Sequence, residues 1–170
     1  RAVRPEMDFI SVVYQPHSYY GVPAEPDLIP TLTRLRDEGL IDRLIEFRPN
    51  VALGYRPNEV AARCMGDQAS VEAGCTHHSS WDVDEMCLAS DLARAKALMQ
   101  EGDWDCSTVR EYGYYRRPTY RITPIQKNTT TFIQKAGIGY CVDSLFPYPV
   151  DPTRKPKNWS KCKVFTQEEF

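Results

Sequence analysis

The first 48 residues contain the pattern that most restricts how this chain folds. Residues 8–14 (DFISVVY) form a short run rich in β-branched and aromatic side chains, which is typical of a buried strand. Three leucines at spacings of four and three predict a helix over residues 28–38, with Asp27 as its N-cap and Gly39 at its end. Alternating polar and apolar residues predict a second strand within residues 40–48. This order favours a parallel βαβ unit and an α/β fold.

The middle of the chain predicts two more helices. Asn58 is suited to cap a short helix over residues 59–65, and the polar stretch 66–80 reads as a loop. Asp82 or Asp84 caps the clearest helix in the chain, which we expect to run to about residue 100. Its apolar stripe consists of Leu88, Leu92, Ala95 and Met99.

Beyond residue 112 the composition favours strands and extended chain. Residues 119–125 and 130–134 are rich in β-branched residues and predict a hairpin. Residues 146–157 carry four prolines, which predicts an extended C-terminal arm. We find no internal repeat in the sequence.

Charge and hydropathy argue against a nucleic-acid partner and against a membrane-spanning helix. The 170 residues include 21 Lys and Arg against 23 Asp and Glu, so the net charge is -2 and no global basic field exists to hold a nucleic acid. No apolar run approaches the roughly 20 residues of a membrane-spanning helix. We therefore expect no nucleic-acid partner and no membrane span in this chain.

The cysteines and two sequons point to an oxidising compartment. The even count of six allows three disulfides, whose pairing the sequence leaves open. Asn128 and Asn158 stand in N-x-[ST] glycosylation sequons. Together these features predict a secreted or lumenal, disulfide-stabilised glycoprotein, although a cytosolic protein with scattered buried thiols is the alternative. The expected disulfide cysteines are Cys64, Cys75, Cys87, Cys106, Cys141 and Cys162.

Several local strings are shared with a known family. Residues 75–77 (CTH) are similar to a Cys-Gln-His stretch, and residues 87–89 (CLA) to a cysteine on the following helix. Residues 141–145 (CVDSL), followed by residues 159–162 (WSKC), are similar to a Cys-Val-Glu-Ser-Leu string with a later Trp-x-x-Cys. With the strand, helix and strand of residues 8–48, these strings resemble the gamma-interferon-inducible lysosomal thiol reductase family. That resemblance implies a thioredoxin-like fold with a helical insertion.

The chain departs from this family where the chemistry occurs. The reactive C-x-x-C expected after the first strand is absent, and residues 17–20 (HSYY) stand there instead. The long interval before Cys141 implies an insertion at about residues 103–136 that forms an extra β-hairpin. The resemblance thus implies a thioredoxin-like domain over residues 1–145 and an arm over residues 146–170, without the reductase dithiol.

An aromatic and basic cluster is the best candidate for partner contacts. Tyrosine and arginine are enriched at the energetic centres of protein interfaces, and their alternation also suits single-stranded nucleic acid. The low net charge favours protein, and the structural alternative is an exposed strand whose tyrosine rings pack on a sheet. The cluster consists of Tyr112, Tyr114, Tyr115, Arg116, Arg117, Tyr120 and Arg121.

Catalytic motifs are missing from the sequence. It contains no G-x-S-x-G, H-E-x-x-H, P-loop or G-x-G-x-x-G pattern, and the Cys75, His77 and His78 spacing is not that of a zinc pair. We expect no metal and no cofactor. The sequence favours a non-catalytic domain that acts as a structural or protein-binding subunit of a larger assembly. The alternatives are a thiol oxidoreductase using a non-standard cysteine and a hydrolase centred on His77 or His78.

Overall fold

The N-terminal βαβ unit forms as the sequence predicts. In a computed structural model, which describes residues 3–117, 119–123, 129–142, 145–146, 148–149, 151–166 and 169, strand β1 (Ser11–Tyr14) pairs in parallel with β2 (Arg43–Glu46). Helix α1 (Leu28–Asp37) connects the two strands. Gly39 adopts a φ of +72° just after the helix, a conformation that favours glycine. Before β1 lies a short 3-10 helix, η1 (Arg4–Glu6).

Helix α2 is much longer than the predicted helix over residues 59–65. It spans Tyr55–Glu72, so the prediction of a polar loop from residue 66 is wrong. The helix begins early because Pro57 lies in its first turn, where the missing N–H is not needed. It continues through Gly66 because this residue packs closely against neighbouring side chains: a Cβ there would lie 3.6 Å from His78 Cε1 and 3.7 Å from Val13 Cγ2.

Asn58 does not cap the helix as predicted. It lies inside α2, is buried, and binds the preceding turn instead. Its Oδ1 accepts a hydrogen bond of 2.7 Å from Asn50 N, and its Nδ2 donates to Asn50 O at 2.8 Å and Gly54 O at 2.5 Å. The Asn58 side chain therefore holds the turn that leads into α2. It does not accept hydrogen bonds from the free N–H groups of the first helical turn, as a cap would.

Helix α3 spans Ala89–Glu101, and the prediction that Asp82 or Asp84 caps it is wrong. Asp82 is instead paired with arginine side chains, and Leu88 occupies the N-cap position. The predicted apolar stripe is confirmed in its last three members, which are buried, whereas Leu88 is exposed. The main core cluster consists of Leu92, Ala95, Met99, Ile133 and Phe165.

A four-stranded mixed sheet lies under α3, with the strand order β10-β4-β5-β3. Strand β4 (Cys106–Arg110) was not predicted, and it pairs antiparallel with β5 (Thr129–Lys135). The predicted hairpin partner, residues 119–125, is wrong in its described part, because residues 119–123 form no strand. A hairpin does arise within residues 103–136, but from β4 and β5. Strand β3 (His77–His78) forms one edge of the sheet and β10 (Cys162–Val164) the other.

The segment predicted as an extended C-terminal arm contributes to the body of the protein. Strand β10 pairs in parallel with β4, with Cys162 opposite Cys106. Strand β9 (Lys155–Pro156) pairs with β6 (Tyr140–Cys141), and β7 (Leu145–Phe146) pairs with β8 (Tyr148–Pro149). Arg154 is buried, with only 1% of the residue exposed, because carboxylates from elsewhere in the chain surround it.

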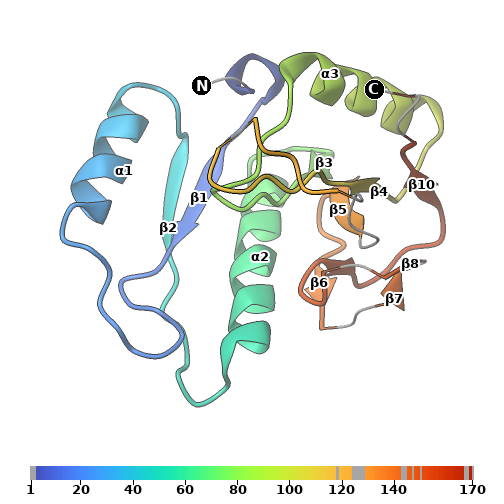
Figure 1. Cartoon of the computed structure of the whole chain (residues 1–170). Coiled ribbons are helices and arrows are strands. Elements are labelled where there is room, and N and C mark those ends of the chain that lie inside the picture. The colour runs from blue at the N-terminus through green and yellow to red at the C-terminus, as the bar shows by residue number, and fades with distance from the viewer. Residues whose placement is uncertain are drawn as a thin grey trace.

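The β1–β2 sheet and the four-stranded sheet lie on either side of α2. Figure 1 shows the β1–β2 pair with α1 on the left, the four-stranded sheet with α3 on the right, and α2 between them. Helix α2 contacts β1 on one side and β3 and β6 on the other. The mixed α/β class is therefore the one predicted.

Candidate functional site

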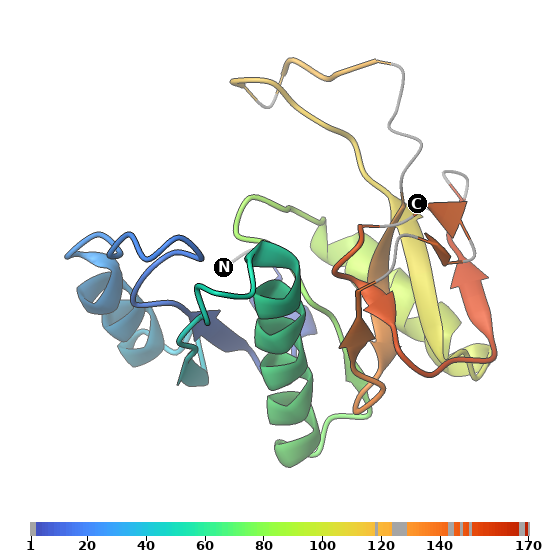
Figure 2. The ribbon, with the colours of Figure 1, turned by 90° about the horizontal axis from the view of Figure 1, so that it is seen from below.

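The predicted tyrosine–arginine cluster lies on a segment that projects from the body. Residues 111–117 and 119–123 follow β4 and extend away from both sheets, as the yellow and orange chain in Figure 2 shows. The exposed fractions of Tyr112, Tyr114, Tyr115 and Tyr120 range from 41% to 59%, and Ile122 is 45% exposed. We call residues 111–117 and 119–123 the projecting loop. The structural alternative, in which these rings pack on a sheet, is not what the structure shows.

The arginines of the projecting loop stack on its tyrosines. Arg121 Cζ lies 4.7 Å from the centre of the Tyr112 ring, and Arg116 Cζ lies 5.2 Å from that of Tyr115. Such cation–π contacts hold each guanidinium close to a ring. Within the described part of the chain, none of Arg116, Arg117 and Arg121 forms an ion pair with a carboxylate.

Backbone hydrogen bonds give the tip of the loop a defined turn. Tyr115 N donates to Tyr120 O at 2.9 Å, and Ile122 N donates to Gly113 O at 2.8 Å. Tyr114 and Arg121 form an isolated antiparallel bridge. The loop therefore presents its side chains from a partly ordered backbone, which lowers the entropy lost on binding.

A buried charge network connects three distant parts of the chain. Arg63, on α2, donates to Glu59 Oε1 at 2.7 Å, Asp82 Oδ1 at 3.0 Å and Ser80 Oγ at 2.8 Å. Arg154 Nη2 lies 2.5 Å from Glu85 Oε1 and also contacts Asp82. Both arginine side chains are almost fully buried, so their charges require these carboxylates. The network ties the C-terminal segment to α2 and to the loop before α3.

His78 and Ser70 form a buried pair that the sequence did not indicate. Ser70 Oγ lies 2.9 Å from His78 Nδ1 and 3.3 Å from Gly66 O. Because the serine hydroxyl donates to that carbonyl, His78 Nδ1–H donates to the hydroxyl. Nε2 is then an acceptor that has no hydrogen-bond partner in the described part of the chain. Burial lowers the pKa of His78 to about 4, so the ring is neutral near pH 7.

His77 lies apart from this pair. Its Nδ1 is 3.0 Å from Thr76 Oγ1, and burial together with the nearby Lys135 ammonium lowers its pKa. The two histidines therefore do not act on a shared atom. Among the described residues no group of three or more His, Cys, Asp and Glu side chains is placed to hold a metal ion.

All six cysteines are free thiols in the structure. Cys106 and Cys162 lie opposite each other in the parallel β4–β10 pair and contact each other. A hydrogen bond between the two sulfurs raises the pKa of Cys106, which burial raises further, and lowers the pKa of Cys162. Burial raises the pKa of Cys75 and raises that of Cys87 to about 11. The expected disulfides stay a prediction, as does glycosylation: Asn158 is exposed, and Asn128 lies outside the described residues.

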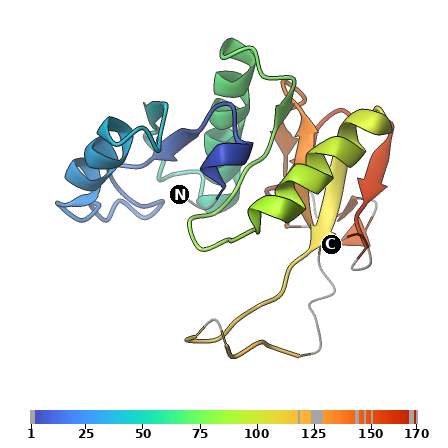
Figure 3. The ribbon, with the colours of Figure 1, turned by 90° about the horizontal axis from the view of Figure 1, so that it is seen from above.

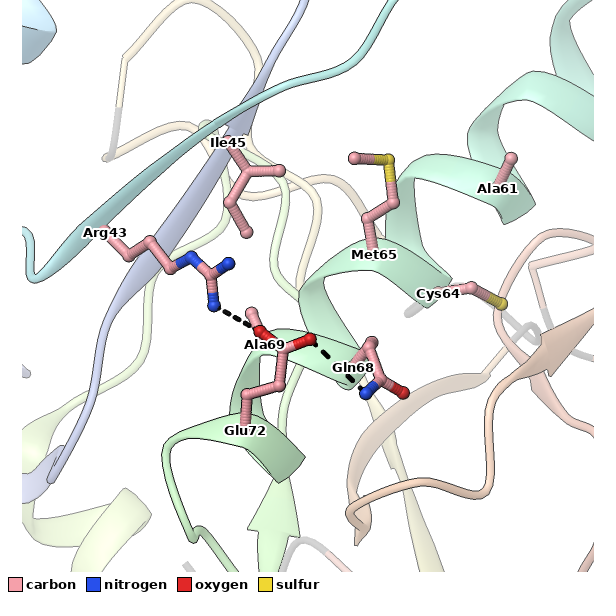
Figure 4. A pocket seen from close by; sticks show the side chains of 8 residues that line it. All are labelled: Arg43, Ile45, Ala61, Cys64, Met65, Gln68, Ala69 and Glu72. Atoms are coloured by element: carbon pink, nitrogen blue, oxygen red, sulfur yellow. Dashed lines mark hydrogen bonds and ion pairs between the residues drawn. The ribbon is translucent and has the colours of Figure 1, made fainter.

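Cys64 borders a small groove of about 310 Å³ between β2 and α2. Figure 4 shows Ile45 and Met65 facing each other across it, with the 2.5 Å ion pair between Arg43 and Glu72 at one side. The Cys64 side chain points away from that ion pair, and its Sγ accepts a hydrogen bond of 3.4 Å from Tyr140 N. The groove thus holds no group that is arranged for chemistry.

Sequence patterns identified the projecting loop but not the residues that the fold brings together. Ser70, Arg63 and Arg154 belong to no local motif, and only their long-range partners distinguish them. None of the helices in the described ranges combines the length and apolar character needed to cross a bilayer. Searches of protein-family models, curated proteins and solved structures find no match to this chain.

Proposed function

We propose that this chain is a non-catalytic protein-binding domain of a secreted or lumenal assembly, and that the projecting loop is its main contact surface. The observation that carries the proposal is a cluster of half-exposed tyrosines with stacked arginines, which form no ion pair with the described residues, on a segment that leaves the body of the protein. Tyrosine and arginine dominate the energetic centres of interfaces. The parallel β1–β2 pair joined by α1 supports a thioredoxin-like core as the scaffold.

The charge of the projecting loop defines the chemistry of the partner. Between residues 110 and 123 the chain has four arginines and one glutamate, whereas the whole chain has a net charge of -2. A locally basic and aromatic surface on an acidic protein is complementary to an acidic protein surface. The domain therefore binds a partner that presents Asp and Glu around an apolar patch.

A charge-reversal experiment tests this proposal. Affinity capture from the secretory fraction uses the wild-type chain, the triple variant Arg116→Glu/Arg117→Glu/Arg121→Glu, and the control Arg56→Glu. Arg56 is matched because it also stacks on a tyrosine, at 5.6 Å from the Tyr55 ring, but lies on α2. Any captured protein is then purified and its affinity is measured directly by calorimetry.

We expect the triple variant to weaken binding by at least about tenfold and Arg56→Glu to leave it unchanged. The affinity of the wild type should fall as salt increases, because the contact is between opposite charges. Equal affinity of the triple variant would show that the loop is not the contact surface. Capture of RNA or single-stranded DNA that depends on the same three arginines would show that the partner class is wrong.

One observation favours a second candidate function, a thiol oxidoreductase that lacks C-x-x-C. Cys106 and Cys162 are brought together by the β4–β10 pairing, and their pKa values are shifted in opposite directions. In such a reaction the Cys162 thiolate attacks a client disulfide and displaces one client thiolate. Cys106 then attacks Cys162 Sγ in the mixed disulfide and releases the second client thiol.

Insulin reduction with dithiothreitol distinguishes the two functions. If Cys106 and Cys162 are catalytic, the wild type accelerates the reaction and Cys162→Ser abolishes the acceleration, whereas Cys141→Ser does not. If the domain is non-catalytic, the wild type and both variants match the rate of dithiothreitol alone.

A further inference from the structure

A cleft lies between the β1–β2 sheet and the four-stranded sheet. It has a volume of about 730 Å³ and is bordered by β1 on one side and by the segment containing β3 on the other. Residues of α2 line it between the two strands, and residues of α3 close one end. In Figure 3, which looks down on the molecule from above, β1 and β3 flank α2.

Both strands that border the cleft are edge strands. In the described ranges, β1 pairs only with β2, and β3 pairs only with β5. Asp42 N and Phe47 N donate to Ile10 O and Tyr14 O, so the even-numbered residues of this segment face β2. The backbone groups of Ser11 and Val13 therefore face the opposite edge, where the cleft lies. An open edge of this kind is a template for another strand.

The same α2 residue, Gly66, lies beside both strands. A Cβ on Gly66 would lie at ordinary contact distance from Val13 on β1 and from His78 on β3. The two strands thus rest on a common helix face while belonging to separate sheets. An added strand on the β1 edge would lie over this face, beside β3.

His78 independently indicates that the cleft can bind a hydrogen-bond donor. The residue lines the cleft and is 9% exposed, and its Nε2 has no hydrogen-bond partner among the residues that the structure describes. Its Nδ1 is already used by Ser70. An unpaired buried acceptor is costly, and a backbone N–H from an added strand satisfies it.

The charges of the cleft select a basic occupant. Its lining contains the carboxylates of Glu6, Asp8, Glu59 and Asp82 but only two cations, Arg63 and Lys96. Arg63 is already bound to Glu59 and Asp82, and Asp82 also binds Arg154, so the acidic end of the cleft is the one that contains Glu6 and Asp8. Lys96 Nζ donates to Glu6 O at 2.6 Å and lies 3.8 Å from Asp8. Met7, Val12, Leu92 and Ile133 add apolar surface.

From these observations we infer that the cleft binds an extended segment of another protein, with alternating apolar and basic residues, by strand addition to the free edge of β1. Alternate side chains of a strand point to opposite faces, so the apolar residues pack toward the core and the basic ones toward the carboxylates. The four residues of β1 offer about 13 Å of edge. This site is separate from the projecting loop and does not depend on its function.

Synthetic peptides of about eight residues test the inference on the wild-type protein. The probe alternates valine and lysine, and binding is followed by fluorescence anisotropy. One comparison peptide alternates valine and glutamate, and another carries N-methyl groups on every second residue of the valine–lysine sequence. We expect the unmodified probe to bind saturably and both comparison peptides to bind at least about tenfold more weakly.

Two proline variants locate the contact. Val13→Pro removes an N–H from the edge of β1 that faces the cleft, and Glu46→Pro removes one from the edge of β2 that faces away from β1. We expect Val13→Pro to weaken binding of the probe by at least about tenfold and Glu46→Pro to leave it unchanged.

Three results would overturn the inference. They are equal binding of the N-methylated peptide, equal binding of the valine–glutamate peptide, and no saturable binding of the probe up to about 1 mM. A dimer in sedimentation experiments that the probe dissociates would show that the occupant is a second copy of this chain rather than another protein.

Discussion

Arg154 Nη2 lies 2.5 Å from Asp82 Oδ2 and thereby joins the C-terminal segment to the loop before α3. The same Asp82 carboxylate accepts a hydrogen bond from Arg63 on α2. The partly exposed Asp82 carboxylate thus neutralises two buried guanidinium groups. No short sequence pattern encodes this arrangement. Removal of the Asp82 carboxylate leaves the positive charges of both arginines with fewer negative charges beside them.

The first prediction concerns this shared carboxylate. Asp82→Asn should lower the free energy of unfolding by about 2 kcal/mol, because it removes one carboxylate partner from two buried arginines, while Arg63 keeps Glu59 and Arg154 keeps Glu85. Urea denaturation measures the change. The control is Asp84→Asn, two residues away, where the side chain is exposed. If both variants unfold at the same urea concentration, the network does not stabilise the fold.

The second prediction concerns the turn before α2. Asn58→Ala removes three hydrogen bonds from a buried position and should cost about 2–3 kcal/mol of stability. In the variant, the Asn50 amide should exchange its hydrogen faster than in the wild type, because its acceptor, Asn58 Oδ1, is lost. Unchanged protection at Asn50 N would contradict the geometry described above.

The third prediction concerns pH. His78 has a folded-state pKa of about 4, and an unfolded histidine titrates near 6.5, so between these values the unfolded chain binds the extra proton. The stability contributed by neutral His78 is therefore complete above about pH 6.5 and is lost as the pH falls toward 4, by roughly 3 kcal/mol in total. Over this range, the free energy of unfolding should fall more steeply with decreasing pH for the wild type than for His78→Gln, as measured by denaturation at each pH. Parallel pH profiles would show that His78 is not buried in neutral form.

The fourth prediction concerns thiol reactivity. Iodoacetamide should alkylate Cys162 faster than Cys106 in the native protein, because their mutual hydrogen bond lowers the pKa of the first thiol and raises that of the second. Cys87, with a pKa of about 11, should also react slowly near pH 8. In denaturant the three rates should converge. Native labelling of Cys106 as fast as that of Cys162 would remove the support for the oxidoreductase alternative.

The elements that local sequence predicts well are those with complete local signals. Helix α1 and the strands around it have clear apolar spacing and a glycine at the helix end, and they form as predicted. Helix α2 was predicted too short because Gly66 resembles a stop signal. In the structure Gly66 is buried in the interior of the helix, beside His78 and Val13.

For the candidate sites, too, local sequence patterns indicated one part and missed another. The residues of the projecting loop were identified from their composition, since tyrosine and arginine alternate along the chain. The cleft was not identified, because it depends on the separation of β1 from β3 across α2. Strand β4 was missed because its partner β10 lies more than fifty residues away, beyond the reach of any local pattern.

The pairing of β10 with β4 also affects how the protein is made. During synthesis β4 leaves the ribosome long before Cys162–Val164, so one of its edges stays uncovered while the intervening chain is produced. An uncovered strand edge recruits other chains. This edge of β4 therefore cannot be covered by β10 until residues 162–164 have been synthesised.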